Sequence, residues 1–199
     1  MIVLKVIIIL VEAYLFGSIN SGVLVSRLLK NDDVRTKGSG NAGATNVARV
    51  YGFGFGLLTL LGDVMKTVIA ALIGKWIMGD VGQTIACVGC LIGHAWPVFF
   101  QFKGGKAVSV GAGIIAVLDW RVLVLAVSLF LIIVVITRYV SLGSMCAAIS
   151  FPILLAIMSH PQWYEEALAV WVACMVVFLH RANIKRLLSH SESKFVIKK

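Results

Sequence analysis

Charged residues are scarce in this chain. They make up 14% of its 199 residues, while 60% are hydrophobic. A soluble domain has about 25% charged and about 45–50% apolar residues. The composition therefore excludes an ordinary soluble domain and indicates an integral membrane protein. The opening apolar run has only Lys5 near its start and no clear small-residue cleavage site, so we expect a first spanning segment and not a cleaved signal.

Carboxylates are especially few. The nine Asp and Glu residues are scattered, and no set of His, Asp and Glu has metal-ligand spacing. We therefore expect a mechanism without a metal ion or another cofactor. No G-x-S-x-G surrounds Ser39, which argues against a serine hydrolase. The turn F-K-G-G-K-A lacks the first glycine and the Ser or Thr of G-x-x-x-x-G-K-S/T, which argues against a nucleotide triphosphatase.

The four cysteines all lie within apolar runs. Cys87 and Cys90 form a C-x-x-C pair, a spacing that can support redox or zinc chemistry. Inside a spanning segment, however, we expect both residues to pack as small hydrophobic side chains.

Seven apolar segments approach or reach the length of about 20 residues that a membrane-spanning helix needs. They cover residues 2–25, 53–77, 81–100, 107–118, 122–136, 142–158 and 167–179. The sequence therefore predicts an all-α membrane protein with seven transmembrane helices, forming a single domain over residues 1–199. The fourth, fifth and seventh segments are short, so counts of six or five stay open.

Two charges lie inside the second segment. Asp63 and Lys66 are three residues apart and therefore share one helix face. Charges at membrane depth are costly unless they are paired or face a cavity. Two interpretations are open: the two residues form a structural pair, or they help to hold the polar loop at Arg35–Arg49. At the end of the third segment, Pro97 predicts a kink or a broken helix, and His94 is expected to order the turn that follows.

Lysine and arginine are distributed unevenly between the two sides that seven spans would define. Fourteen lie on one side: Arg27, Lys30, Arg35, Lys37, Arg49, Lys103, Lys106, Arg138, Arg181, Lys185, Arg186, Lys194, Lys198 and Lys199. Three lie on the other: Lys5, Lys75 and Arg121. The positive-inside rule then predicts an outside N-terminus and a cytoplasmic C-terminus. The net charge of +9 fits orientation and attraction to anionic lipid, and no nucleic-acid partner is expected.

Three polar elements share the predicted cytoplasmic side: Arg35–Arg49, Lys103–Lys106 and His180–Arg186. Glycines let backbone N–H groups form an anion nest, and cations add contacts to phosphate oxygens. We therefore expect a pocket for anionic ligands on this face. His180 and Asn183 are expected to share a face of the last helix. The simpler alternatives are a plain linker, a tight membrane turn and a satisfied interfacial histidine.

These motifs resemble those of the bacterial membrane acyltransferases that acylate glycerol 3-phosphate from acyl phosphate. The resemblance is carried by G-S-G-N-A-G-A-T-N-V-A-R at Gly38–Arg49, G-H-A-W-P-V-F-F-Q-F-K-G-G-K at Gly93–Lys106 and H-R-A-N-I-K-R-L at His180–Leu187. Smaller matches are G-S-I-N-S-G at Gly17–Gly22, D-V-M-K at Asp63–Lys66 and R-Y-V-S-L at Arg138–Leu142. Order and spacing agree over nearly the whole chain.

The resemblance implies a seven-helix acyltransferase of the bacterial inner membrane, with its site at the cytoplasmic face. It implies transfer of a fatty acyl group to the 1-hydroxyl of glycerol 3-phosphate, giving lysophosphatidic acid and phosphate in the first step of phospholipid synthesis. Acyl-CoA and acyl carrier protein would not be direct donors, and the expected partners are membrane lipid and the enzyme that makes acyl phosphate. The expected catalytic residues are Ser39, Lys106, His180 and Asn183. The expected substrate-binding residues are Arg35, Gly38, Gly40, Asn41, Gly43, Thr45, Asn46, Arg49, Gly104 and Gly105.

Three positions depart from the family pattern. Ala107 stands where the second motif usually continues with glycine, and its Cβ is expected to narrow the backbone approach. The tail reads S-H-S-E where G-x-E is usual, which leaves the part of Glu192 open. Asn20 stands where proline is common.

The expected chemistry is direct attack of the substrate hydroxyl on an already activated acyl phosphate, with cations offsetting the repulsion of two phosphates. His180 either takes the proton or holds a substrate phosphate that takes it. A transporter for small organic phosphates is the competing class; polar groups at one face and the lack of an internal repeat argue against it. A non-catalytic lipid-binding scaffold is the third class, and the density of phosphate-site residues argues against it.

Overall fold

The computed structural model describes residues 1–195, in which nine α-helices and two short 3-10 helices alternate with turns. Lys198 and Lys199, which entered the charge count, lie outside the described residues. The described chain forms two compact units, residues 1–114 and residues 115–195. The single domain over 1–199 stays a prediction, and each unit is described by itself.

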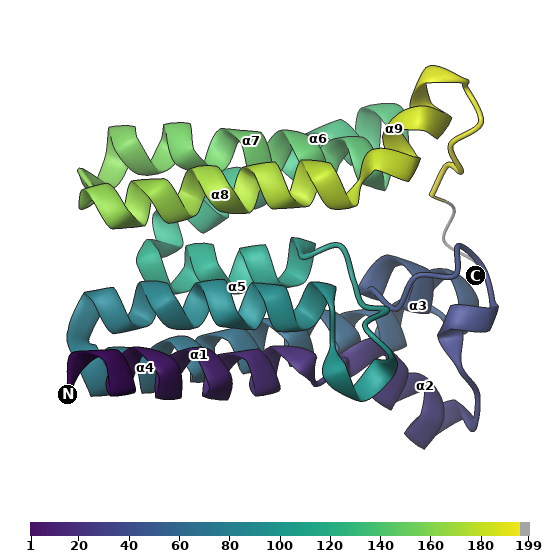
Figure 1. Ribbon diagram of the computed structural model, residues 1–199. Helices are drawn as coiled ribbons and strands as arrows, with labels where there is room; N and C mark the ends of the chain where they lie inside the picture. Colours follow the sequence, from purple (N-terminus) through teal and green to yellow (C-terminus); the bar gives the residue numbers. More distant parts are fainter. Residues whose placement is uncertain (196–199) are drawn as a thin grey trace. The chain divides into compact units, whose positions relative to one another are not determined.

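The first unit is built on two helices that lie side by side, α1 (Ile2–Ser18) and the long α4 (Phe53–Ala95) (Figure 1). Glycines allow their backbones to approach closely, as is usual between membrane helices. A Cβ added at Gly17 would lie 2.1 Å from the carbonyl oxygen of Cys90, and one at Gly93 would lie 2.2 Å from that of Tyr14. Cys87 and Cys90 are buried free thiols in this packing, as predicted.

Helix α4 is two helical arms joined at a break. Met78 and Gly79 leave the helical region, and Gly79 has φ +64 with ψ −153, which favours glycine. The arms then pack closely, since a Cβ at Gly82 would lie 2.1 Å from the carbonyl oxygen of Gly74. The predicted second and third segments, residues 53–77 and 81–100, are therefore separated by a break at 78–79, and Gly82 is helical.

The first apolar segment is also broken, so the expectation of one helix over residues 2–25 was wrong. Helix α1 ends at Ser18, and α2 (Ser21–Lys30) starts with Asn20 as its N-cap. The Asn20 Oδ1 accepts a hydrogen bond from the Val23 N–H at 3.1 Å. Such a side-chain cap satisfies an N–H group that the first helical turn leaves without a partner.

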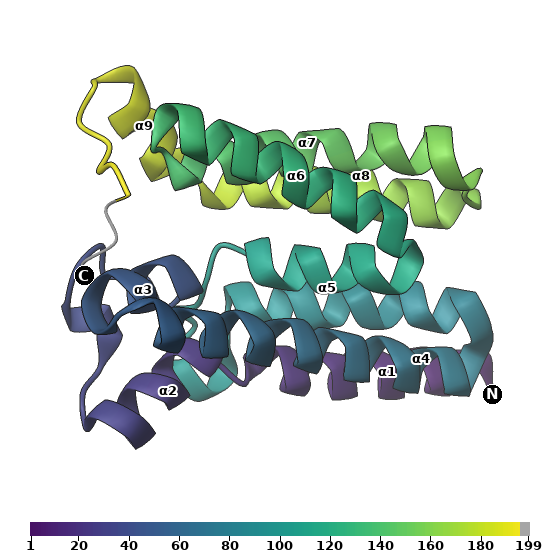
Figure 2. The same cartoon turned by 180° about the vertical axis from the view of Figure 1, so that it is seen from behind.

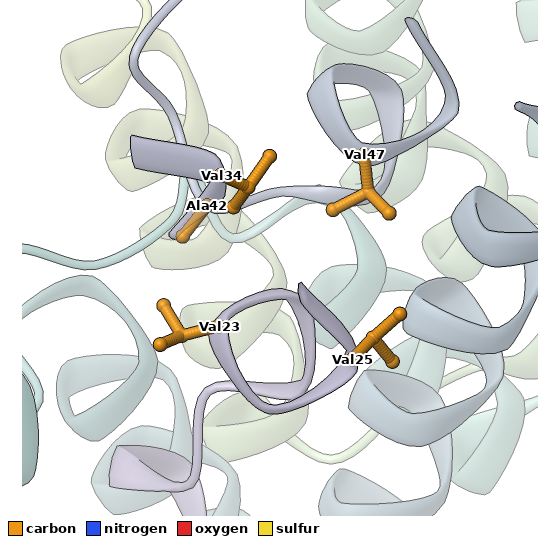
Figure 3. Close-up of a cluster of buried hydrophobic side chains, with 5 residues drawn as sticks. All are labelled: Val23, Val25, Val34, Ala42 and Val47. Atoms are coloured by element: carbon orange, nitrogen blue, oxygen red, sulfur yellow. The ribbon is translucent and has the colours of Figure 1, made fainter. Parts of the chain in front are cut away.

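The polar interval between the first two predicted spanning segments, residues 26–52, contains regular structure. Helix α2 runs to Lys30, a 3-10 turn η1 covers Val34–Thr36, and α3 covers Ala44–Tyr51. Figure 3 shows the buried cluster that holds these pieces together, and its members are Val23, Val25, Val34, Ala42 and Val47. The polar stretch is therefore a folded cap on its own small core, and a plain flexible linker is excluded.

Helix α4 ends at Ala95, before the predicted residue 100. Pro97, which has no N–H to continue a helix, precedes the 3-10 turn η2 (Val98–Phe100). The chain then returns through residues 101–107 into α5 (Val108–Leu118). Gly113 of α5 packs on α4, because a Cβ there would lie 2.8 Å from the Thr67 Cβ.

The second unit contains three helices that lie side by side in both views and a short fourth helix (Figures 1 and 2). They are α6 (Trp120–Thr137), α7 (Val140–Ser159), α8 (Trp163–Leu179) and α9 (Arg181–Leu188). Asp119 caps α6 by accepting the Arg121 N–H at 2.8 Å, and a capping box between Gln162 and Glu165 opens α8.

Within residues 1–195, four helical segments are long and apolar enough to cross a membrane, or five if the pair α8 and α9, bent by 57°, is one span. The four are Ile2–Lys30, Phe53–Phe100, Trp120–Thr137 and Val140–Ser159, and Val108–Leu118 is a shorter apolar helix. The described chain is thus an all-α membrane fold, as predicted, while the count of seven spans stays a prediction.

Candidate functional site

The side chain of Asn46, on α3, organises the glycine-rich stretch, residues 35–43. Its Oδ1 accepts the backbone N–H of Ser39 at 2.8 Å. Its Nδ2 lies 2.9–3.1 Å from three loop carbonyl oxygens, those of Val34, Lys37 and Asn41. Asn46 is buried, so this amide replaces water for backbone groups that would otherwise lose hydrogen bonds. In this structure the Asn46 amide is engaged by the loop itself, and a contact with substrate stays a prediction.

Two glycines of this stretch need their conformational freedom. Gly38 has φ +60 and Gly40 has φ +72, a region that side-chain-bearing residues rarely adopt. A Cβ at Gly38 would also lie 2.2 Å from the Asn46 Oδ1. At the end of the stretch, the Asn41 Oδ1 accepts the Gly43 N–H at 2.8 Å, and Gly43 is the N-cap of α3.

Arg35 is clamped by Asp33. The guanidinium makes two bonds to the carboxylate, Nε to Oδ1 at 3.0 Å and Nη2 to Oδ2 at 2.7 Å, a fork geometry that carboxylate and guanidinium match well. Its Nη1 donates to the Phe100 carbonyl at 3.3 Å, which ties the stretch to the turn after α4. The hydrogen bond from Arg35 outweighs burial and holds the pKa of the Asp33 carboxyl well below its usual range.

The Gly104–Gly105 turn packs directly against His94, the penultimate residue of α4. The Gly105 N–H donates to the His94 carbonyl at 3.1 Å. A Cβ at Gly104 would lie 2.0 Å from that carbonyl oxygen, and one at Gly105 would lie 2.1 Å from the ring Nε2. His94 therefore orders this turn, as predicted. Gln101 and Phe102, just before it, both have φ +58, so the turn also stores backbone strain.

A cavity of about 300 Å³ lies where the glycine-rich stretch meets this turn. Its lining residues are Asp33, Arg35, Thr36, Gly40, Gln101, Lys103 and Gly104. Two cations, two glycines and one carboxylate thus face a small space. Such a cavity suits a compact anion that can accept several hydrogen bonds.

A buried polar network lies beneath the turn. The Lys66 Nζ is 2.9 Å from the Asp63 Oδ1 and 3.1 Å from the His94 Nδ1. It also donates to the carbonyls of Gly17 at 3.0 Å and Ile19 at 2.6 Å, at the break between α1 and α2. This cation therefore compensates the negative C-terminal end of α1. The pair is therefore structural and holds the break between α1 and α2, and a role in holding the polar loop stays a prediction.

The other predicted residues of the first unit are more accessible. Ser39 is exposed, and Thr45, Arg49 and Lys106 are partly buried. Among the described residues, no hydrogen bond or ion pair engages the Arg49 guanidinium. Ala107 is buried with φ +61, a left-handed conformation that explains why glycine suits this position.

In the second unit, Glu192 organises the predicted residue Asn183. Its Oε1 accepts the Asn183 Nδ2–H at 2.6 Å and the Ser141 hydroxyl at 2.7 Å, and its Oε2 accepts the Arg186 Nε–H at 2.6 Å. Burial raises the pKa of this carboxyl, but the hydrogen bonds from the three partners outweigh burial and lower the pKa. Glu192 therefore fixes the Asn183 amide despite the departure from the family pattern.

His180 lies at the bend between α8 and α9, so the expectation of one continuous helix through His180 and Asn183 was wrong. His180 has φ −92 and ψ 7 and precedes Arg181, the first residue of α9. Its Nδ1 lies 2.7 Å from the Val176 carbonyl oxygen. A carbonyl only accepts, so Nδ1 carries a proton, and in the neutral imidazole the lone pair lies on Nε2.

The structure brings the first two polar elements together within the first unit and places the third in the second unit. Two cavity-lining residues, Asp33 and Gln101, lie outside the predicted polar elements, and two more, Thr36 and Lys103, lie within them but were not named as site residues. The D-x-R spacing of Asp33 and Arg35 is a sequence signal that would have suggested the clamp. The left-handed backbone at Gln101 has no such signal.

The chain is similar to known proteins over nearly its whole length. A family model described as glycerol-3-phosphate acyltransferase matches residues 7–190. A glycerol-3-phosphate acyltransferase of Syntrophomonas wolfei subsp. wolfei is 43% identical over 189 residues, covering 95% of this chain and 96% of the relative. One of Thermoanaerobacter sp. (strain X514) is 40% identical over 185 residues, covering 92% and 91%.

Two solved structures have the same fold. They are crystal structures of PlsY, an integral membrane glycerol 3-phosphate acyltransferase, in a glycerol 3-phosphate form and a lysophosphatidic acid form. The first has a TM-score of 0.89 and 36% identity, covering 96% of each chain. The second has a TM-score of 0.88 and 34% identity, covering 96% of this chain and 95% of the other.

Proposed function

The chain belongs to the glycerol-3-phosphate acyltransferase family, and from this premise we propose that it transfers a fatty acyl group from acyl phosphate to the 1-hydroxyl of glycerol 3-phosphate. The products are lysophosphatidic acid and inorganic phosphate. Its family membership and its apolar helices place the enzyme in a membrane. We infer that this is the bacterial inner membrane, with the N-terminus outside and the C-terminus and the site on the cytoplasmic side.

The observation that carries the proposal is the cavity between the glycine-rich stretch and the Gly104–Gly105 turn. Arg35 and Lys103 supply positive charge there, and Gly40 and Gly104 also line the cavity. Both proposed substrates carry a phosphate, so the site must hold two anions near each other. Preorganised cations and N–H groups reduce the cost of that repulsion.

Further groups suited to phosphate lie on α3 and α5. The N-terminus of α3 follows Gly43, and that of α5 follows Ala107. Helix N-termini present backbone N–H groups and a positive dipole end to anions. The half-buried Arg49 guanidinium has its donors available, and the exposed Ser39 hydroxyl can orient a substrate oxygen. We infer that these groups and Lys106 bind the donor and acceptor phosphates.

His180 and Asn183 are the residues that we expect to handle the proton. Because Nδ1 donates to the Val176 carbonyl, Nε2 is the ring nitrogen that we expect to take part in proton transfer from the substrate hydroxyl or from a substrate phosphate. The Asn183 amide, held by Glu192, is suited to orient a substrate oxygen. Positioning alone supplies a large part of the rate in such reactions.

The proposed reaction is a single displacement at the acyl carbonyl. The 1-hydroxyl oxygen forms a bond to the carbonyl carbon, and the bond from that carbon to the phosphate oxygen breaks. The phosphate leaves with the electron pair, and the hydroxyl proton passes to His180 or to a substrate phosphate. The donor is already activated, so no acyl-enzyme is needed, and the enzyme that makes acyl phosphate is the expected partner.

Purified protein in lipid with palmitoyl phosphate and glycerol 3-phosphate, without CoA, carrier protein or divalent metal, tests the proposal. We expect phosphate release that depends on glycerol 3-phosphate, with lysophosphatidic acid as product. Ser39→Ala and Lys106→Ala should lose most activity, and Lys75→Met, at an exposed ion pair, is the matched control. A trapped acyl-enzyme on Ser39 would refute direct attack, and the absence of product would refute the donor.

A further inference from the structure

Three ionisable residues that the proposed mechanism does not use lie under the Gly104–Gly105 turn. Asp63 and Lys66 come from the first arm of α4, and His94 comes from the end of the second arm. Their exposed fractions are 1%, 5% and 2%. Burying such groups inside a membrane protein is costly, and intramembrane ionisable residues often serve function.

Lys66 determines which nitrogen of His94 holds the ring proton. The Lys66 Nζ lies 3.1 Å from the His94 Nδ1. A lysine ammonium has three donors and no lone pair, so Nδ1 must accept. The imidazole is then neutral with its proton on Nε2, because the bond at one nitrogen sets the state of the other. The Asp63 Oδ1 lies 2.9 Å from the same Nζ and forms an ion pair with it.

The protonated nitrogen of His94 faces the turn. Nε2 occupies the place of the side chain that Gly105 lacks, since a Cβ there would lie 2.1 Å from it. The His94 carbonyl accepts the Gly105 N–H at 3.1 Å. One residue thus touches the turn with its ring and with its backbone, and Gly104 of this turn lines the cavity.

We propose that His94 is a positioning residue for the acyl transfer: Asp63 and Lys66 hold its proton on Nε2, and the oriented ring keeps the Gly104–Gly105 turn in the shape that receives a substrate phosphate. The proposal rests on the proposed function. It differs from simple core packing because it requires one tautomer and predicts an effect on phosphate binding.

Nitrogen-15 NMR of the histidine-labelled wild-type protein tests the tautomer directly. The chain has four histidines, so the His94 signals follow by elimination from spectra of His160→Asn, His180→Asn and His190→Asn. We expect a neutral ring with the proton on Nε2 near neutral pH. A proton on Nδ1, or an imidazolium with both nitrogens protonated, would overturn the proposal, and this readout needs no variant at position 94.

Kinetics of two His94 variants test the positioning role. In His94→Gln the longer amide can place an N–H near the position of Nε2, whereas the shorter side chain of His94→Asn cannot reach Gly105. We expect His94→Asn to raise the KM for one of the two phosphate substrates by about ten- to a hundredfold, because losing one hydrogen bond to a charged phosphate weakens binding by about that factor. Its kcat should change by less than about threefold, and His94→Gln should restore most of the affinity.

The control is His160→Asn, at an exposed histidine outside this network with φ +46, a conformation that asparagine tolerates. Its KM and kcat should equal those of the wild type. Unchanged KM values for both substrates in His94→Asn would overturn the positioning role, as would a loss confined to kcat. If the wild type itself formed no lysophosphatidic acid, the proposed function would fail, and the NMR spectrum would still decide the tautomer.

Discussion

Replacing Lys66 by methionine should destabilise the protein strongly, because it removes one partner of a buried ion pair. The ammonium lies 2.9 Å from the Asp63 Oδ1 and donates to the carbonyls of Gly17 and Ile19. Methionine has a similar length and no donor. Asp63 would keep its hydrogen bond from the Ser109 hydroxyl at 2.9 Å, but its charge would be left without compensation.

Breaking a buried pair in this way costs about 3–5 kcal/mol. For a chain of this size, each kcal/mol lowers the melting temperature by about 2–4 °C, so the expected decrease in Tm is roughly 6–20 °C. The assay is thermal unfolding of the purified protein in detergent at one fixed scan rate, because the apparent Tm of an irreversibly unfolding protein depends on that rate.

Two further variants separate a buried pair from a general effect of losing a lysine. Lys75 pairs with Asp80 at 2.8 Å, but about half of each side chain is exposed, so Lys75→Met should change the Tm by no more than about 2 °C. The double variant Asp63→Asn with Lys66→Met removes both charges and should be more stable than Lys66→Met alone. A Lys66→Met protein that melts within about 2 °C of the wild type would refute the argument.

Three other predictions concern the loop, the turn and the second unit. Asn46→Ala removes the amide that donates a hydrogen bond to the Lys37 carbonyl, so trypsin should cleave after Lys37 at least about tenfold faster. An unchanged cleavage rate would show that the loop does not depend on the Asn46 hydrogen bonds. Ala107 has φ +61, and Ala107→Gly relieves this backbone strain but buries less apolar surface and increases the entropy of the unfolded chain, so the free energy of unfolding should change by no more than about 1 kcal/mol. Ala107→Val should lower the free energy of unfolding by about 1–3 kcal/mol. Equal melting temperatures of the glycine and valine variants would contradict this. The pKa of Glu192 is lowered in the folded state by its hydrogen bonds, against the effect of burial, so its stabilisation is present above the unfolded pKa of about 4.3 and is lost as pH falls below it. The Tm difference between wild type and Glu192→Gln should therefore be nearly constant between about pH 7 and pH 5 and should shrink as the pH falls below about 4.3. A difference that stays constant below this pH would be the contrary result.

Composition and hydropathy predicted the class of fold, because apolar runs near 20 residues have few alternatives to membrane helices. Helix ends were predicted less well. Asn20 caps a new helix inside what looked like one apolar segment, and α3 forms inside what looked like a loop. Such ends depend on individual hydrogen bonds and on a small local core, which averages over many residues do not detect.

The sequence by itself determined that this is an α-helical membrane protein with glycine-rich, basic segments of the kind that bind phosphate. Local chemistry sufficed for this, because hydropathy, glycine and charge act over a few neighbouring residues. Only the tertiary structure decided which of these residues meet. It joins Arg35 to Phe100 and places the ring of His94 against Gly105. It also engages the Asn46 amide with loop backbone and the Asn183 amide with Glu192. The contact of Arg35 with Phe100 joins residues 65 positions apart, and the other contacts join neighbouring but separate segments. The geometry of all of them depends on how helices pack around buried polar groups.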